Sequence, residues 1–306
     1  MRISICIPVY NAQKTIEELV SAVELELHDY ELEFVLVNDG SKDKSELVCD
    51  LLALKNERVR FISLRRNFGE HNAVMCALNY MTGDVAVIID DDFQNPPEEI
   101  IHLVREIEKG FDVVYSFYAD KKHNLFRNMG SQFNDRVASW LLNKPRNLYL
   151  SSFKAIRREI VDEIIKYKGP FPYVDGLILR VTDNFSAVQV KHQHRETGKS
   201  NYTVRKLISL WLNVFINFSI KPLRAFTLFG ILVVVLSVLF IIYLVIDKVN
   251  NPYESQGWAS IMVSITFFSG IQIIFLGLMS EYLGKHYLTT NNTPQWTIKK
   301  RFFNRH

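Results

Sequence analysis

Cysteine is scarce in this 306-residue sequence, which contains only Cys6, Cys49 and Cys76 and no CxxC spacing. Three scattered cysteines argue against a disulfide framework or a zinc site and are typical of a reducing compartment. A large charge of one sign is also absent, because 36 Lys and Arg against 33 Asp and Glu leave a net charge of +3. With 48% hydrophobic residues, the chain is neither disordered nor a nucleic-acid-binding arm. We therefore expect a folded protein with no nucleic-acid partner.

Charge is missing altogether from two long segments, 225–246 and 258–280. As α-helices that rise ~1.5 Å per residue, segments of 22 and 23 residues would each span the ~30 Å hydrocarbon layer of a membrane. Neither segment shows the polar stripe expected of a long helix buried in a soluble protein. The sequence therefore predicts a two-helix transmembrane hairpin.

The charges beside these segments predict the orientation of the hairpin. The connection 247–257 has a net charge of −1, whereas the residues after Glu281 carry five Lys or Arg and no acid. Positive charge marks the cytoplasmic side. We expect a multi-pass protein of the plasma membrane, with its N-terminal domain (1–200) and its basic tail (283–306) in the cytoplasm.

Residues 201–224 read as a juxtamembrane amphipathic helix in the headgroup layer, since apolar side chains recur there at helical spacing. These side chains are Leu207, Trp211, Phe215 and Phe218. A packed core helix is the alternative. Gln272 lies among small residues in the second span and is typical of a hydrogen bond between helices, within the chain or across a homo-oligomer.

Residues 1–200 show apolar strand-like runs that alternate with helical patterns. The expected strands are 3–9, 33–37, 59–64, 85–89 and 113–115, and the expected helices are 12–27, 43–55, 70–81 and 97–109. This alternation indicates an α/β, Rossmann-like domain with a mostly parallel sheet covered on both faces. Ligands bind beyond the carboxyl ends of the strands in such sheets.

Polar and acidic residues follow the expected strands, and the fourth strand runs into Asp90, Asp91 and Asp92. Adjacent carboxylates repel one another unless a cation or solvent is near. Asp90 and Asp92 share a face of an extended backbone, and with the Gln94 amide they offer the oxygen ligands that Mg²⁺ or Mn²⁺ prefers. The alternative is a solvated acidic turn that precedes the helix at 97–109.

Four ordered motifs resemble the family-two glycosyltransferases with a GT-A nucleotide-sugar domain. They are PVYN at 8–11, NDGSKD at 38–43, RRNFG at 65–69 and DDDFQNPPE at 90–98. The resemblance is greatest to the polyisoprenyl-phosphate branch, which includes bactoprenol glucosyltransferases and dolichol-phosphate mannose synthases. Later segments match in the same order, at 152–158, 194–202, 217–224 and 281–285.

The resemblance implies a membrane-bound inverting enzyme of cell-envelope glycan modification. It would move one sugar from a nucleotide sugar, a UDP-sugar in preference to a GDP-sugar, to a polyisoprenyl phosphate such as undecaprenyl phosphate. Asp90, Asp92 and Arg195 would be catalytic, and Asp90, Asp92 and Gln94 would bind the metal. Donor contacts would come from Pro8, Tyr10, Asn11, Asp39 and Asp91. The acceptor phosphate would meet Arg127, Ser131, Lys154, Arg195, Lys199 and Ser200, because an anionic phosphate requires such contacts.

The sequence departs from the family motif GDFRL, whose aspartate and arginine are Ser152 and Lys154 here. Two other functions stay open. A processive polysaccharide synthase shares the donor domain but carries a Q-x-x-R-W motif, and none of the four tryptophans follows an arginine. A catalytically silent membrane scaffold is the second alternative, against which the intact acidic cluster argues.

Overall fold

The computed structural model describes residues 1–118, 148–191 and 257–303, together with helical residues scattered between 228 and 250. The chain divides into two compact units. The first contains Met1–Asn201 and Asn291–His306, and the second contains Tyr202–Thr290. The first unit is therefore built from two parts of the sequence that the second unit separates.

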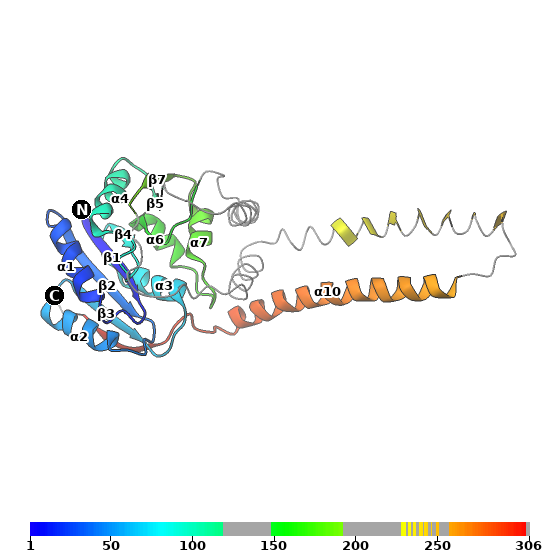
Figure 1. The fold of residues 1–306 in the computed structure, drawn as a ribbon, viewed down its shortest axis with the longest axis horizontal. Coiled ribbons are helices and arrows are strands. Elements are labelled where there is room, and N and C mark those ends of the chain that lie inside the picture. Colours follow the sequence, from blue (N-terminus) through cyan, green and yellow to red (C-terminus); the bar gives the residue numbers. More distant parts are fainter. Residues whose placement is uncertain are drawn as a thin grey trace. The chain divides into compact units, whose positions relative to one another are not determined.

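A single eight-stranded sheet forms the centre of the first unit, with the strand order β7-β5-β6-β4-β1-β2-β3-β8 (Figure 1). Its strands are β1 (Arg2–Val9), β2 (Glu31–Asn38), β3 (Val59–Leu64), β4 (Val85–Ile88), β5 (Val113–Phe117), β6 (Lys154–Arg157), β7 (Phe185–Gln189) and β8 (Ile298–Phe302). The central strands β4, β1, β2 and β3 are parallel, whereas β6 and β8 are antiparallel to their neighbours. The sheet is thus mixed, with a parallel centre.

Helices cover both faces of this sheet. One face carries α1 (Ile16–Glu26), α2 (Ser45–Lys55) and α4 (Ile100–Glu108), which follows the 3₁₀ turn Pro97–Glu99 (Figure 1). The other face carries α3 (Glu70–Tyr80), α6 (Arg158–Ile164) and α7 (Val174–Val181).

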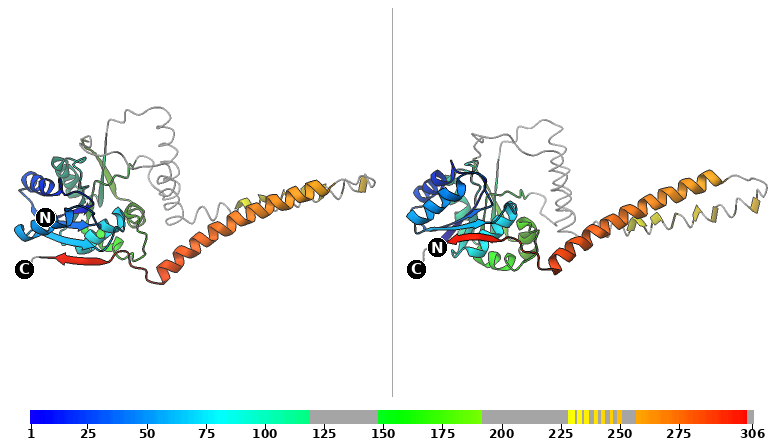
Figure 2. Two further views of the ribbon diagram at one scale, coloured as in Figure 1. Left: turned by 60° about the horizontal axis from the view of Figure 1, so that its bottom comes forward. Right: turned by 90° about the horizontal axis from the view of Figure 1, so that it is seen from below.

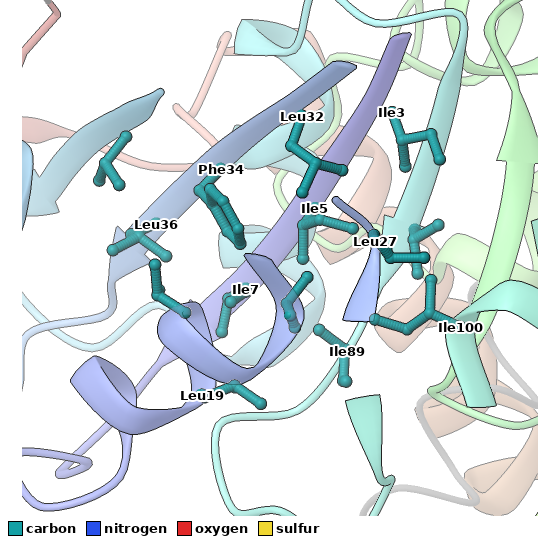
Figure 3. Packing of buried hydrophobic residues seen from close by; sticks show 14 of the residues in the cluster. Ile3, Ile5, Ile7, Leu19, Leu27, Leu32, Phe34, Leu36, Ile89 and Ile100 are labelled. Atoms are coloured by element: carbon teal, nitrogen blue, oxygen red, sulfur yellow. The ribbon is translucent and has the colours of Figure 1, made fainter. Parts of the chain in front are cut away.

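Alternation along β1 explains why both faces are covered. Ile3, Ile5 and Ile7 point into the core beneath α1 and α4, where Leu19 and Ile100 meet them (Figure 3). Successive side chains of a strand point to opposite faces, so the residues between these isoleucines lie beneath α3. Fully burying one such isoleucine stabilises the fold by about 1.5–3 kcal/mol.

The predicted strands and helices up to residue 117 are confirmed, with boundaries that move by a few residues. The strands β6, β7 and β8 were not predicted. In particular, residues 283–306 were expected to form a basic tail outside the catalytic domain, and this part of the prediction is wrong. Residues Ile298–Phe302 form β8 at the edge of the same sheet, paired with β3 (Figure 2, in red).

The second unit contains α10 (Trp258–Thr290), a continuous helix of 33 residues. Within it, Phe267–Thr290 is long and apolar enough to cross a membrane, and it is the one such helix among the described residues. It overlaps the predicted span 258–280 and extends ten residues beyond its end. The predicted span 225–246 is described only in part, and the described residues in it are helical. The predicted amphipathic region 201–224 lies outside the described residues.

Candidate active site

The candidate site lies where β1, β2 and β4 end. These strands are adjacent and parallel, with Val9 opposite Asn38 and Cys6 opposite Ile88, so their carboxyl ends reach the same edge of the sheet. The polar residues that follow each strand therefore come together from three separate parts of the sequence, as the pattern of strands and polar ends predicts.

Asp39, directly after β2, is the most enclosed carboxylate of this edge and is only 3% exposed. Its Oδ1 accepts the backbone N–H of Phe68 at 2.7 Å, and its Oδ2 accepts that of Gly69 at 2.9 Å. Desolvation raises the pKa of Asp39 above its ordinary value, while the two amide bonds act in the opposite direction. The side chain is thus fixed by the loop 65–69. Each oxygen still has a second lone pair for a ligand.

The turn after Asp39 explains why glycine follows it. Gly40 has φ of +64°, and a Cβ at this position would lie 2.5 Å from the carbonyl carbon of Arg66 and from the nitrogen of Asn67. The loop 65–69 therefore packs directly on the turn, and only glycine permits both the backbone conformation and the close approach.

The loop after β1 is tied to the loop after β2 through Asn11. Its N–H donates to Ser41 Oγ at 3.0 Å, and its Oδ1 accepts the Lys42 N–H at 2.9 Å. Asn11 has φ of +58°, a conformation that asparagine tolerates better than most residues. The neighbouring Tyr10 side chain is 44% exposed, so its ring is accessible to a ligand.

The three carboxylates after β4 have three different partners. Asp91 Oδ2 accepts the Tyr10 N–H at 2.8 Å, and Asp92 Oδ1 accepts the Gln94 N–H at 3.2 Å. Asp90 Oδ2 accepts the hydroxyl of Ser152 at 2.6 Å. Asp91 therefore joins the loops after β1 and β4, while Asp90 is oriented from the β6 side.

Ser152 reaches Asp90 because β6 pairs with β4, which places Lys154 opposite Ile88. The residue that replaces the motif's aspartate thus lies beside the acidic cluster. A serine hydroxyl donates a hydrogen bond to Asp90, whereas a second carboxylate at 152 would repel it.

Lys154 was predicted to contact the acceptor phosphate, but in the structure it lies in a buried ion pair. Alternation along β6 directs Phe153 into the core beneath α4 and Lys154 to the opposite face, where its ammonium forms an ion pair with Asp175 of α7. The two residues are 3% and 6% exposed. The Tyr115 hydroxyl donates to the same Asp175 oxygen at 3.2 Å. Lys154 is therefore enclosed in an internal ion pair, and this assignment is corrected.

The first turn of α3 brings two further titratable residues to this region, neither of which was assigned a role from the sequence. Desolvation by the surrounding chain, followed by the charge of Asp90, raises the pKa of Glu70 to about 7, although Glu70 is an exposed residue and solvent screening reduces both effects. His71 meets the Tyr173 ring edge-on at 5.1 Å, and burial lowers the pKa of its imidazole. The sequence signal that could have indicated Glu70 is its position directly after Gly69, at the end of the RRNFG motif.

Comparison with known proteins assigns the family. Residues 4–165, more than half of the chain, match the family model described as Glycosyl transferase family 2. The chain belongs to glycosyl transferase family 2. Residues 221–285 match a second family model, the GtrB C-terminal hairpin.

Relatives of this family 2 chain match it along nearly its whole length. It is 30% identical to the undecaprenyl-phosphate 4-deoxy-4-formamido-L-arabinose transferase of Enterobacter sp. (strain 638), over 98% of this chain and 93% of that protein. It is 31% identical to the bactoprenol glucosyl transferase of Shigella phage SfX, over 98% of this chain and 100% of that protein.

A solved structure shares the fold at lower identity. The glucosyl-3-phosphoglycerate synthase of Mycobacterium tuberculosis, in complex with Mn²⁺, UDP-glucose and phosphoglyceric acid, superimposes with a TM-score of 0.54 at 19% identity. The match covers 70% of this chain and 77% of that one. It supports a GT-A-like α/β fold for the first unit.

The chemistry of the acidic cluster Asp90, Asp91 and Asp92 bears on whether it can hold a divalent cation. Among the described residues, no three His, Cys, Asp or Glu side chains form a ready-made cation site. Asp90 and Asp92 nevertheless keep partial solvent exposure, and a carboxylate offers about four lone-pair sites, more than a single hydrogen bond uses. Magnesium-like ions are held in nucleotide sites by one or two carboxylates, with substrate phosphates and water as the other ligands. The residues therefore fit a cation that binds together with a diphosphate.

The structure thus brings together the predicted donor and metal residues Pro8, Tyr10, Asn11, Asp39, Asp90, Asp91, Asp92 and Gln94 at one edge of the sheet. The remaining predicted acceptor residues of this family 2 protein, Arg127, Ser131, Arg195, Lys199 and Ser200, lie outside the described residues.

Proposed function

We propose that this protein transfers one sugar from a UDP-sugar to a polyisoprenyl phosphate such as undecaprenyl phosphate, with inversion at the anomeric carbon. The observation that carries the proposal is that Asp39, Asp90 and Asp92 come together at the carboxyl ends of the parallel strands β2 and β4. The names of the full-length relatives, a bactoprenol glucosyl transferase and an undecaprenyl-phosphate sugar transferase, support the acceptor. The fold neighbour solved with UDP-glucose supports the donor.

The donor half of the site would hold the nucleotide. Asp39 would accept hydrogen bonds from the base or ribose, because the loop 65–69 keeps its carboxylate fixed and each oxygen has a second lone pair beside the one that accepts an amide N–H. The exposed ring of Tyr10 offers a stacking surface for the base. Asp91 and Asn11 would position these groups by holding the loops after β1, β2 and β4 together.

Asp90, Asp92 and Gln94 would hold Mg²⁺ or Mn²⁺ with the diphosphate of the donor. When bound, such an ion neutralises the negative charge that grows on the departing nucleoside diphosphate. The Ser152 hydroxyl would keep the Asp90 carboxylate in one orientation, since their hydrogen bond is 2.6 Å long.

The acceptor requires little proton removal before it attacks. A phosphate monoester has a second pKa of about 6, so it is largely dianionic at pH 7. One phosphate oxygen would attack the anomeric carbon in line with the bond to the diphosphate, and that bond would break with inversion. A general base is therefore not needed at position 152, where the family motif has an aspartate. Arg127, Ser131, Arg195, Lys199 and Ser200 would hold the acceptor phosphate.

The membrane arrangement that we propose has two spans, with the catalytic unit in the cytoplasm. Both ends of the segment Tyr202–Thr290 join the same folded unit, so this segment would cross a membrane an even number of times. α10 offers one crossing, and the apolar segment 225–246 would supply the other. The match to the GtrB C-terminal hairpin at 221–285 supports this pairing.

Membranes that contain the protein, incubated with radiolabelled UDP- and GDP-sugars and undecaprenyl phosphate, test the proposal. A lipid-linked monosaccharide that mild acid releases is the expected product. A polymer would instead support a processive synthase, and the absence of both products would support a catalytically silent scaffold.

A further inference from the structure

The C-terminal strand β8 adjoins the loop that holds Asp39, although more than 200 residues separate them in sequence. β8 pairs antiparallel with β3, with Ser63 opposite Lys300 and Leu64 opposite Ile298. The pairing continues past the strand, because the Thr297 carbonyl accepts the Arg65 N–H at 2.9 Å. The C-terminal segment therefore fixes the first residue of the loop 65–69.

At its other end, the same loop donates hydrogen bonds to the carboxylate of Asp39. Phe68 and Gly69 donate their N–H groups to Asp39, and the backbone of Arg66 and Asn67 rests against Gly40. A loop of five residues thus lies between two fixed points, the Thr297 carbonyl and the Asp39 carboxylate.

A second route connects β8 to the donor site through α2. Lys299 Nζ lies 3.0 Å from both carboxylate oxygens of Glu46, and Lys300 pairs with Glu46 at 3.2 Å and with Asp50. α2 begins at Ser45, whose Oγ accepts the N–H of Ala12 at 2.8 Å, in the loop that follows Tyr10 and Asn11. Displacing β8 would therefore weaken the contacts that hold two loops of the donor site, the loop 65–69 and the loop that follows β1.

Two further contacts hold the ends of this segment. Gln295 is buried and donates from Nε2 to the Tyr167 carbonyl at 2.9 Å. At the far end, the Phe303 ring lies 5.5 Å from the Tyr80 ring and beneath the Arg60 guanidinium at 5.3 Å. Phe303 lies at the opposite end of β3 from the loop 65–69, so the two ends of the segment can be perturbed separately.

We propose that the segment 295–303, which follows the membrane hairpin in sequence, is a positioning element of the donor site. It holds the loop 65–69 and the N-terminal end of α2, and so keeps Asp39 in the orientation that binds the nucleotide. This inference rests on the proposed function. It assigns to the C-terminal strand a part in donor affinity, beyond covering the edge of β3.

The test reverses the charges that attach β8 to α2. Lys299→Glu/Lys300→Glu in the full-length chain places four acidic groups together, and adding Glu46→Lys/Asp50→Lys restores opposite charges with the pairs exchanged. Lys166→Glu, which disrupts the surface ion pair with Glu163, is the matched control. Calorimetry with UDP and Mn²⁺ gives the dissociation constant, and steady-state transfer gives the donor KM and kcat.

We expect UDP affinity to fall by up to about tenfold in the reversed variant, which is near the lower end of the effect of losing one hydrogen bond to a charged group. The donor KM should rise equally, kcat at saturating donor should stay within about twofold, and the charge exchange should restore binding. Lys299→Ala should show a smaller loss of the same sign, which serves if the reversed variant gives little folded protein.

Phe303→Ala separates positioning from general stability, because it weakens the anchor far from the donor loop. It should lower the melting temperature and leave UDP affinity unchanged. Unchanged UDP affinity in both Lys299 variants, or an equal loss in Phe303→Ala at an equal melting temperature, would overturn the inference. If the wild-type chain binds neither UDP nor GDP, the proposed function itself fails, and this outcome is distinct from the others.

Discussion

Gly40→Ala is the substitution whose cost can be worked most directly from the geometry of the site. A side chain in the left-handed region at φ of +64° costs about 1–2 kcal/mol. The added Cβ would also lie 2.5 Å from two backbone atoms of the loop 65–69, which cannot rotate away as a side chain could. Overpacking of this kind costs about 1–3 kcal/mol. We therefore expect the free energy of unfolding to fall by about 2–5 kcal/mol, the sum of the two.

Gly110→Ala is the matched control. Gly110 has φ of +109°, follows α4 at the other end of the sheet, and has no atom within 4 Å of the position of a Cβ. Gly110→Ala should lose only the conformational part of the free energy of unfolding, which is at least about 1–2 kcal/mol, the cost in the left-handed region, because φ of +109° lies beyond that region. At about 2–4 °C per kcal/mol for a domain of this size, the overlap at Gly40 should by itself lower the melting temperature by about 2–12 °C, a part that Gly110→Ala lacks.

Thermal melts of the purified full-length variants measure this difference, and calorimetry with UDP measures its functional part. Relief of the overlap would move the loop 65–69 away from Asp39, so Gly40→Ala should also lose UDP affinity while Gly110→Ala keeps it. Equal melting temperatures for the two variants, with unchanged UDP binding in both, would refute the packing argument.

Four further predictions follow from the site and the charge pattern. Asp92→Asn should remove most turnover and weaken Mn²⁺ binding by calorimetry without unfolding the domain, and wild-type rates in excess chelator would contradict the metal role. Arg195→Ala should lower kcat/KM for undecaprenyl phosphate by about 10- to 150-fold, with the donor dissociation constant within about twofold of wild type; a collapse of donor binding instead would place Arg195 on the nucleotide side. Cysteines at positions 251 and 304 should react with impermeant reagents from opposite sides of the membrane, and reaction from one side would overturn the hairpin. The raised pKa of Glu70 means that the folded state favours its protonated form, so in metal-free buffer this contribution to stability is complete below about pH 4.5 and is lost as pH rises through about 7. Glu70→Gln should flatten that part of the stability profile, with an amplitude reduced by solvent screening, and an unchanged profile would exclude Glu70 as its source.

The fold of residues 1–117 was predictable because burial on both faces leaves a strong pattern. β1 and β2 are nearly continuous apolar runs, and the polar residues begin where each strand ends. β8 could not be recognised in this way. Its residues Lys299, Lys300 and Arg301 read as a solvated basic tail, and their strand conformation depends on pairing with β3 and on the carboxylates of α2. Such long-range partners leave no local periodicity.

The strand-end residues of the candidate site were predictable for the same reason, whereas their tertiary contacts were not. Asp39, Asp90 and Asp92 follow predicted strands, so the topology alone brings them to one edge. Lys154 was misassigned because a lysine in a functional motif reads as a ligand contact, whereas its partner Asp175 lies 21 residues later on another element. The contacts of Asp39 with the loop 65–69 also depend on tertiary packing that spacing does not reveal.

Sugar transfer to a phosphate carried by a lipid is the activity that we propose for the acidic cluster after β4. The most direct measurement supplies the purified full-length protein with Mn²⁺ and radiolabelled UDP-sugars, and compares undecaprenyl phosphate with undecaprenol as acceptors. We expect an acid-labile lipid-linked monosaccharide from undecaprenyl phosphate alone, and its loss in Asp92→Asn. Equal labelling of undecaprenol, or undiminished product with Asp92→Asn, would contradict it.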